Sequence, residues 1–309
     1  MDLLAAVAVQ AGVAAAAFGL GVGAGRLCRG PGRRRVRELP LALAALAGGA
    51  LALWLIAGRE PVWVVRLLPV PAAIVYGNPA PGLAGLLAGL LAAHAAVPAW
   101  RRLPLAAAVA GVGLWGPAST LLHEPPAVRP SRSAGVDLQT HPATCSAAAA
   151  ATLLRDRGVG GYTEREMARL CLTGERGTPP LGVYRGLFLA AEAAGSPLRP
   201  VFHRLTVQEL RERPDLLPAV VSVRLTDALD AREPRYRREW GWLLNVTHSV
   251  VLFRFTGGGR VEVGDPGAGR EMWSVRGLEE LWVGDVLSLV GESRARLGFR
   301  PGKGVGVRG

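Results

Sequence analysis

Three side chains that lie far apart in the sequence could together carry out nucleophilic chemistry: Cys145, His248 and Asp265. Cys145 stands where a turn-rich stretch gives way to an alanine-rich segment, from Ser146 to Arg157, that predicts a helix. The unpaired N–H groups and the dipole at a helix N-terminus stabilise a thiolate, which is the nucleophilic form of cysteine. A histidine can take the thiol proton, and a carboxylate can orient that histidine. The three residues therefore predict acyl-transfer chemistry with Cys145 as the nucleophile.

A fourth side chain could stabilise the negative charge that such chemistry develops. Gln139 precedes the cysteine in the pattern Gln-x5-Cys, close enough along the chain for its amide to donate to an oxyanion. Ser146 is an alternative nucleophile, but it points about 100° away from Cys145 around the expected helix. Taken alone, each residue favours a structural role, because buried cysteines, core histidines and Asp-Pro turns are common. The joint pattern favours a catalytic site.

The elements that must position these residues follow from the pattern downstream of residue 124. Helices are expected over residues 146–157, 163–172 and 181–194, and the second opens with the capping-box pair Thr163 and Glu166. Alternating or β-rich stretches follow at 198–202, 219–225, 249–255, 260–263 and 286–290, with a glycine turn at 256–259. Helices first and strands afterwards predict an α+β fold, a helical lobe on an antiparallel sheet. This arrangement would bring a helix-borne cysteine to a strand-borne histidine and aspartate.

The N-terminal part of the chain has a different composition. Hydrophobic residues make up 50% of the 309 residues, the mean hydropathy is +0.26, and the apolar residues concentrate before about residue 122. Four apolar runs are long enough to cross a hydrocarbon core of about 30 Å. They cover residues 3–25, 39–57, 82–100 and 103–122. The first run lacks the positively charged start of a signal peptide, so we expect it to be retained as a membrane span.

A further apolar segment, residues 62–76, determines the side of the membrane on which the rest of the chain lies. It is short, and it contains Arg66 and two prolines. With four spans, the arginine-rich loop at 26–37 and the pair Arg101-Arg102 both lie in the cytoplasm, and the soluble part lies outside. With a fifth span at 62–76 the soluble part is cytoplasmic. The positive-inside rule favours four spans, so we expect a multi-pass protein of the cell membrane with an extracytoplasmic soluble part.

Charge and cysteine content exclude several classes of site. The net charge is +12, but the basic residues are scattered among acidic ones and form no aromatic-interleaved stripe, so we expect no nucleic-acid partner. The three cysteines, Cys28, Cys145 and Cys171, form neither a disulfide framework nor a zinc pattern. The chain has no Gly-x4-Gly-Lys-Ser/Thr phosphate loop. We therefore expect no metal, no cofactor and no ATP-binding cassette.

The order of these motifs resembles the bacteriocin-processing peptidases, papain-like cysteine peptidases that cut after a double-glycine leader and are often fused to exporters. The resemblance spans about residues 136–290. It rests on Gln-x5-Cys, Gly177-Thr178, His-x-Val-Val-Leu and the run Gly264-Asp265-Pro266-Gly267. The chain looks more closely like the stand-alone, membrane-anchored bacterial members. It departs from the family at Ser146, where a glycine usually follows the cysteine.

The resemblance implies a role for each candidate residue and a division of the chain. Cys145 would be the nucleophile, His248 the general base and acid, Asp265 its orienting partner and Gln139 the oxyanion donor. The expected parts are a transmembrane helical region over 1–124, a linker over 125–134, a papain-like cysteine peptidase domain over 135–292 and a basic, glycine-rich tail over 293–309.

The function implied is that of a membrane-anchored thiol protease, a hydrolase that cleaves a peptide or protein substrate, with a Gly-Gly leader as the substrate class. Because the chain has no cassette, a link to export would run through a separate exporter. Two alternatives stay open. One is an inactive relative that binds a peptide in the old cleft, and the other is an amidase or transferase that applies the same thiol chemistry to a non-peptide amide.

Overall fold

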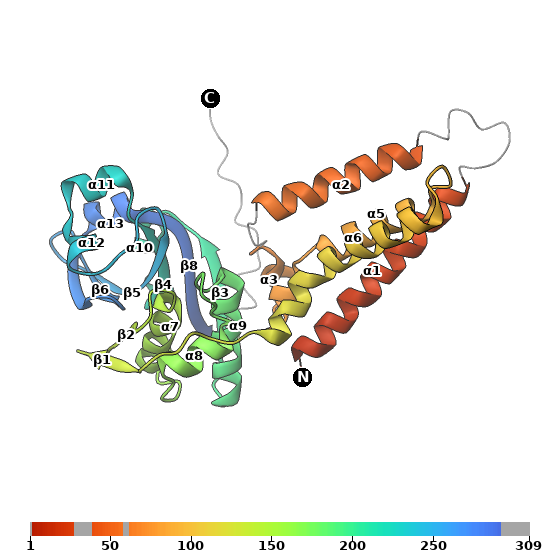
Figure 1. The fold of residues 1–309 in the computed structure, drawn as a ribbon. Coiled ribbons are helices and arrows are strands. Elements are labelled where there is room, and N and C mark those ends of the chain that lie inside the picture. The colour runs from red at the N-terminus through yellow and green to blue at the C-terminus, as the bar shows by residue number, and fades with distance from the viewer. Residues whose placement is uncertain (1, 28–38, 58–61, 292–309) are drawn as a thin grey trace, which may run out of the picture. The chain divides into compact units, whose positions relative to one another are not determined.

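The computed structural model describes residues 2–27, 39–57 and 62–291 of the chain. The chain divides into two compact units (Figure 1). One comprises Met1–Val64 and Ala72–His123, and the other comprises Val65–Pro71 and Glu124–Gly309. The first unit is built from apolar helices, whereas the second combines helices with strands. The mixed helix-and-sheet class and the apolar helical region predicted from the sequence are therefore both present.

The first unit contains four helices that are long and apolar enough to cross a membrane, counted over the described residues: Leu3–Leu27, Leu39–Ile56, Ala73–Ala93 and Ala99–Leu122. Its helices are α1 (Asp2–Leu27), α2 (Leu39–Ala57), α4 (Ala73–Tyr76), α5 (Ala80–Ala93) and α6 (Ala99–Ser119), followed by the 3-10 turn η2 (Thr120–Leu122). The third candidate span starts earlier than the predicted run at 82–100 and ends sooner. It ends because His94 adopts an extended backbone and Pro98 cannot continue a helix.

Residues 62–76 form two four-residue helices, α3 (Val64–Leu67) and α4, rather than one long helix. Among the described residues they make no separate span, although α4 contributes to the start of the third one. Pro69 and Pro71 lie between the two short helices and prevent their fusion. The described helices therefore give four candidate spans and not five.

Glycines allow α1 and α5 to pack with their backbones in contact. A Cβ atom added at Gly85 would collide with the carbonyl group of Ala14, and one added at Gly89 would collide with that of Phe18. Small residues at helix interfaces permit this close approach inside a membrane, where packing and not water exclusion drives association. The glycine-rich composition of the apolar runs thus has a specific use at this interface.

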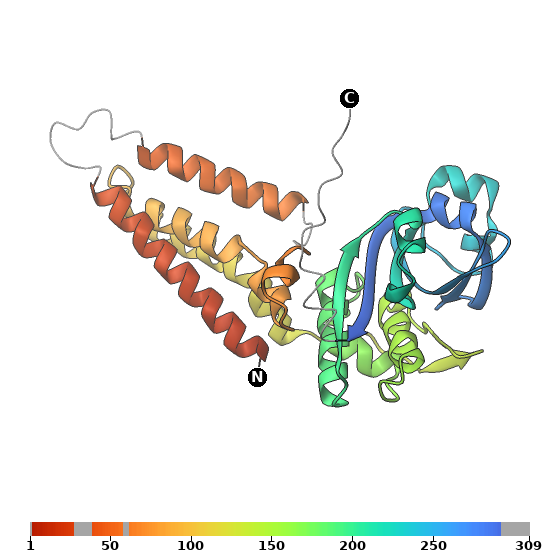
Figure 2. The same ribbon diagram turned by 180° about the vertical axis from the view of Figure 1, so that it is seen from behind.

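The second unit is built on a six-stranded antiparallel sheet in the order β3-β8-β4-β5-β6-β7, in which β3 and β8 lie side by side (Figure 2). The strands are β1 (Ser131–Ser133), β2 (Val136–Leu138), β3 (Leu198–Arg204), β4 (Ala219–Arg224), β5 (Thr247–Thr256), β6 (Arg260–Asp265), β7 (Gly269–Ser274) and β8 (Trp282–Gly291). The helices are α7 (Cys145–Asp156), α8 (Glu164–Leu170), α9 (Pro180–Ala193), α10 (Val207–Arg211), α11 (Asp227–Arg232), α12 (Arg235–Arg238) and α13 (Val275–Leu281), with the 3-10 turn η3 (Pro214–Leu216).

All five predicted strands are present, and the glycine turn at 256–259 joins β5 to β6. The pattern missed β7 and the separate hairpin of β1 and β2. β1 lies within the segment 125–134 that composition predicted to be a linker. The hairpin turns at Ala134 and Gly135, whose φ angles of 48° and 81° are both positive. Its first strand is exposed along its whole length, so no alternation of apolar and polar residues marks it in the sequence.

The helix that begins at Cys145 lies at the centre of this unit. α7 contacts β5 and β4 as well as α8 and α9, and Figure 1 shows the three helices grouped together. Ala147, Ala148, Ala149, Ala150 and Ala151 are all completely buried. Because alanine side chains are small and apolar, this part of the helix can be enclosed on every side, and the two buried polar residues of α7, Ser146 and Thr152, each make a hydrogen bond. The alanine run therefore places the N-terminus of α7 directly beside the sheet.

Candidate active site

The structure brings Cys145, His248 and Asp265 together from three different elements. Cys145 is the first residue of α7, His248 is the second residue of β5, and Asp265 is the last residue of β6. His248 and Asp265 are buried, whereas Cys145 is half-buried. These are the three side chains that the sequence singled out for nucleophilic chemistry.

The carboxylate of Asp265 holds the imidazole in a fixed orientation. His248 Nε2 lies 2.8 Å from Asp265 Oδ1, which also accepts a hydrogen bond of 2.7 Å from the backbone N–H of Gly267. The second oxygen, Oδ2, accepts a hydrogen bond of 2.9 Å from Trp242 Nε1. Since Nε2 is engaged with Asp265, the other ring nitrogen of His248 is left for the thiol of Cys145.

The electrostatics of the site favour a charged pair. Burial raises the pKa of the Cys145 thiol, whereas hydrogen bonding and charge interaction with His248 lower it. The backbone N–H of Ser249 and the hydroxyl of Ser146 lower it as well. The lowering effects together exceed that of burial, so the pKa of Cys145 lies below its usual value. Burial lowers the pKa of His248, but Asp265 and Cys145 raise it more, to about 10. Opposite shifts of this kind favour a thiolate beside an imidazolium near neutral pH.

Cys171 provides a contrast within the same chain. It caps the C-terminal end of α8, is completely buried, and its pKa is raised by burial to about 12. A raised pKa favours the neutral thiol, which is the less reactive form of cysteine. Cys28 lies outside the described residues. Within the described residues, no group of three or more His, Cys, Asp or Glu side chains could hold a metal ion.

Sequence reasoning missed Trp242, which covers the histidine and the aspartate together. Its ring centroid lies 4.5 Å from that of His248, and its N–H donates to Asp265. It belongs to an aromatic cluster with Tyr236, Trp240 and Trp273. Such a cluster keeps water from the His248–Asp265 hydrogen bond and so strengthens it. The run Trp240-Gly241-Trp242 was the only hint in the sequence, and it has no helical or strand period.

Gln139 lies next to the loop that carries the aspartate. It directly follows β2, and its backbone N–H donates a 2.9 Å hydrogen bond to the carbonyl oxygen of Pro266. Its side-chain Oε1 is buried and makes no hydrogen bond to any described residue. The role expected for Gln139, donation to an oxyanion, would use the side-chain N–H and not this oxygen, so it stays a prediction.

A buried glutamate, also missed, fixes the loop between Gln139 and Cys145. Glu164 is completely buried and accepts hydrogen bonds from the backbone N–H of Thr140 at 2.7 Å and from its hydroxyl at 2.8 Å. The hydroxyl of Thr144 donates to the same carboxylate at 2.6 Å. Glu164 thereby ties α8 to both ends of the loop that leads into α7.

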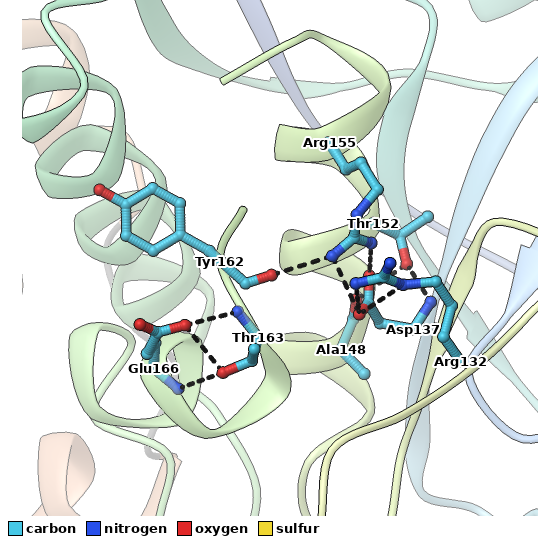
Figure 3. A network of polar contacts seen from close by, with 8 residues as sticks. All are labelled: Arg132, Asp137, Ala148, Thr152, Arg155, Tyr162, Thr163 and Glu166. Atoms are coloured by element: carbon cyan, nitrogen blue, oxygen red, sulfur yellow. Dashed lines mark hydrogen bonds and ion pairs between the residues drawn. The ribbon is translucent and has the colours of Figure 1, made fainter. Parts of the chain in front are cut away.

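A second polar network joins the hairpin to α7, as Figure 3 shows. The carboxylate of Asp137 on β2 pairs with Arg155 on α7 and with Arg132 on β1, and its backbone N–H donates to Thr152 at 2.9 Å. The same figure shows the capping box of α8, in which Thr163 and Glu166 bond each other's backbone, as the sequence predicted. These contacts fix the direction of α7 and of β2, the elements that carry Cys145 and lead to Gln139.

No protein-family model and no curated protein matches this chain. Among solved structures, a double glycine motif protease from an AMS/PCAT transporter, in complex with the leader peptide, is 18% identical, with 53% of this chain and 93% of that one covered and a TM-score of 0.38. The peptidase domain of Streptococcus ComA, a bifunctional ABC transporter involved in a quorum sensing pathway, is 20% identical (50% and 96% covered, TM-score 0.38). That of Streptococcus mutans ComA is 19% identical (50% and 96% covered, TM-score 0.34). All three are peptidases. Because the TM-scores are below 0.5, the roles proposed below rest on the geometry of the site.

Proposed function

We propose that this chain is a membrane-anchored cysteine peptidase with a papain-like site. Cys145 is the nucleophile, His248 the general base and acid, and Asp265 the residue that orients the imidazole. The observation that carries the proposal is the buried contact of 2.8 Å between His248 and Asp265 at the N-terminus of α7. The lowered pKa of Cys145 and the raised pKa of His248 support it, since together they favour the reactive thiolate.

The proposed reaction begins with attack of the Cys145 thiolate on the carbonyl carbon of the peptide bond. The carbonyl oxygen takes up the negative charge and accepts hydrogen bonds from the Gln139 amide and the backbone N–H of Cys145. The His248 imidazolium then gives its proton to the leaving amine, and the C–N bond breaks to leave a thioester. Water, deprotonated by His248, attacks the thioester and releases the carboxylate product and the thiolate.

The proposed substrate is a peptide in which Gly-Gly precedes the cleaved bond. This choice is supported by the motifs around Gln139, Cys145, His248 and Asp265, which resemble those of the double-glycine peptidases. The membrane-anchored form is supported by the four apolar helices long enough to span a bilayer. A separate exporter would then receive or deliver the peptide.

The test is cleavage of a fluorogenic Gly-Gly peptide by the full-length protein in detergent. Cys145→Ala and His248→Ala should each abolish cleavage, whereas Cys171→Ala, a matched loss of a thiol outside the site, should retain it. Full activity in the Cys145→Ala protein would overturn the proposal.

Alkylation by iodoacetamide separates the alternatives from one another. A peptidase should react at Cys145 well ahead of Cys171. Selective alkylation without peptide cleavage would point to an amidase or transferase, and an unreactive Cys145 would point to an inactive peptide-binding module.

A further inference from the structure

A pair of serine hydroxyls joins the two residues that directly follow the proposed nucleophile and base. Ser146 follows Cys145 on α7, and Ser249 follows His248 on β5. Their Oγ atoms lie 2.8 Å apart, and the two residues are only 6% and 7% exposed. This hydrogen bond therefore connects the helix to the strand at the point where the sulfur meets the imidazole.

The serine pair also contacts the sulfur. Cys145 Sγ lies 4.0 Å from Ser146 Oγ, and the backbone N–H of Ser249 donates to the thiol group. Neither hydroxyl makes another side-chain hydrogen bond within the described part of the chain. The side-chain hydrogen-bond partners of the two serines are thus each other and the sulfur of Cys145.

The number of hydroxyl protons determines which serine should donate and which should accept when the sulfur is charged. Each hydroxyl carries one proton and can also accept. When the Ser249 hydroxyl donates to the Ser146 oxygen, the Ser146 proton is free to point toward the sulfur, and both dipoles then favour a negative charge there. Aligned hydroxyls strengthen one another in a site from which water is excluded. A neutral thiol gains less, because it has no full charge to be stabilised.

We propose that Ser146 and Ser249 form a positioning clamp that holds Cys145 against His248 and favours the charged sulfur over the neutral thiol. The inference rests on the proposed function, since it concerns the same cysteine and histidine. It assigns a use to the residue after the cysteine, Ser146, where the resembled family usually has glycine. It also explains why a polar residue, Ser249, is buried on β5 between His248 and the apolar run at residues 250–253.

The test is the pH dependence of iodoacetamide alkylation at Cys145, followed by site-resolved mass spectrometry on the full-length protein in detergent. Ser146→Ala and Ser249→Ala should each raise the midpoint of this profile, and the rate well below the midpoint falls about tenfold for each unit of pKa gained. Ser249→Thr retains the hydroxyl and should retain the wild-type profile. Ser288→Ala is the matched control, because it removes a buried hydroxyl from β8, which is separated from β5 by β4.

The double variant Ser146→Ala/Ser249→Ala separates positioning from folding. Each single variant leaves one buried hydroxyl without its partner, which costs stability, whereas the double variant removes both. The melting temperature should therefore recover in the double variant while the midpoint stays raised. If the wild type has a low midpoint and none of the folded serine variants changes it, this inference is overturned while the proposed function stands. A wild-type midpoint like that of an ordinary thiol would overturn the proposed function.

Discussion

At the residue scale, Asp265 is fixed by three N–H donors, from His248, Trp242 and Gly267. An asparagine at this position would offer only one acceptor oxygen. Its NH₂ group would face one of the N–H groups that donate to Asp265, and two donors cannot form a hydrogen bond with each other. Although burial lowers the pKa of His248, the charge of Asp265 raises it, and the result is about 10. The imidazolium therefore persists up to that pH and is lost above it.

The prediction is that Asp265→Asn moves the alkaline limit of activity to lower pH and leaves a residual rate. The limit falls because the neutral amide no longer raises the pKa of the imidazole, and activity remains because Cys145 is unchanged. A pH–rate profile of Gly-Gly peptide cleavage measures both effects. An alkaline limit equal to that of the wild type would show that Asp265 does not act on the histidine.

A second residue-scale prediction concerns Gln139. Its Oε1 has no partner among the described residues, so truncation breaks no existing hydrogen bond of that oxygen. Gln139→Ala should lower kcat more than it raises KM, because the donor is used as charge develops on the carbonyl oxygen, at a cost of about 2.7–4 kcal/mol in the barrier. Steady-state kinetics on the Gly-Gly peptide checks this. Gln208→Ala on α10 is the control, and an unchanged kcat in Gln139→Ala would leave the backbone N–H of Cys145 as the main donor.

At the scale of elements, the loop before α7 depends on a residue of α8. Glu164→Ala would remove the carboxylate that accepts from the N–H and hydroxyl of Thr140, which is exposed, and from the hydroxyl of Thr144, which is buried. A polar group that is left buried and unpaired costs about 1–3 kcal/mol. We expect a clear fall in the melting temperature of the full-length protein and a loss of peptide cleavage. Glu166→Ala, two positions along the same helix, removes only an exposed capping contact and should cost far less. Equal losses in the two variants would contradict a special role for Glu164.

The elements that the sequence predicted are those with a long period or a strong cap. α7, α8 and α9 follow from the alanine run, the Thr163–Glu166 box and the closing Gly195, and the five predicted strands follow from β-rich runs. β7 was missed because its six residues include no β-branched residue, unlike those of the equally short β4 and β6. The pair Thr206 and Glu209 forms a capping box like that of α8 and could have predicted α10. α11, α12 and α13 lack such a box and have only four to seven residues, too few to show a period. The third membrane helix was misplaced because hydropathy continues past the break at His94.

The same limit applies to the site. Cys145, His248 and Asp265 could be predicted because their residue types suggest chemistry. Trp242 and Glu164 could not, because their importance lies in which groups they contact across the fold and not in any local spacing.

At the scale of the whole molecule, the described helices contain four candidate spans. Together with the arginine-rich loop at 26–37, an even number of spans predicts that the soluble part lies outside the cytoplasm, on the same side as the N-terminus. Reporter fusions after Gly309 check this. Alkaline phosphatase should be active there and green fluorescent protein dark. The reverse result would place the site in the cytoplasm.

The burial of five consecutive alanines in α7 has a consequence for the nucleophile itself. An alanine side chain has no rotamers to lose, so enclosing this helix costs backbone entropy but no side-chain entropy over Ala147–Ala151. A larger side chain at any of these positions would have to displace the sheet or a neighbouring helix. Close packing therefore restricts movement of the α7 backbone, and with it movement of the Cα atom of Cys145, at no cost in side-chain entropy over these five residues.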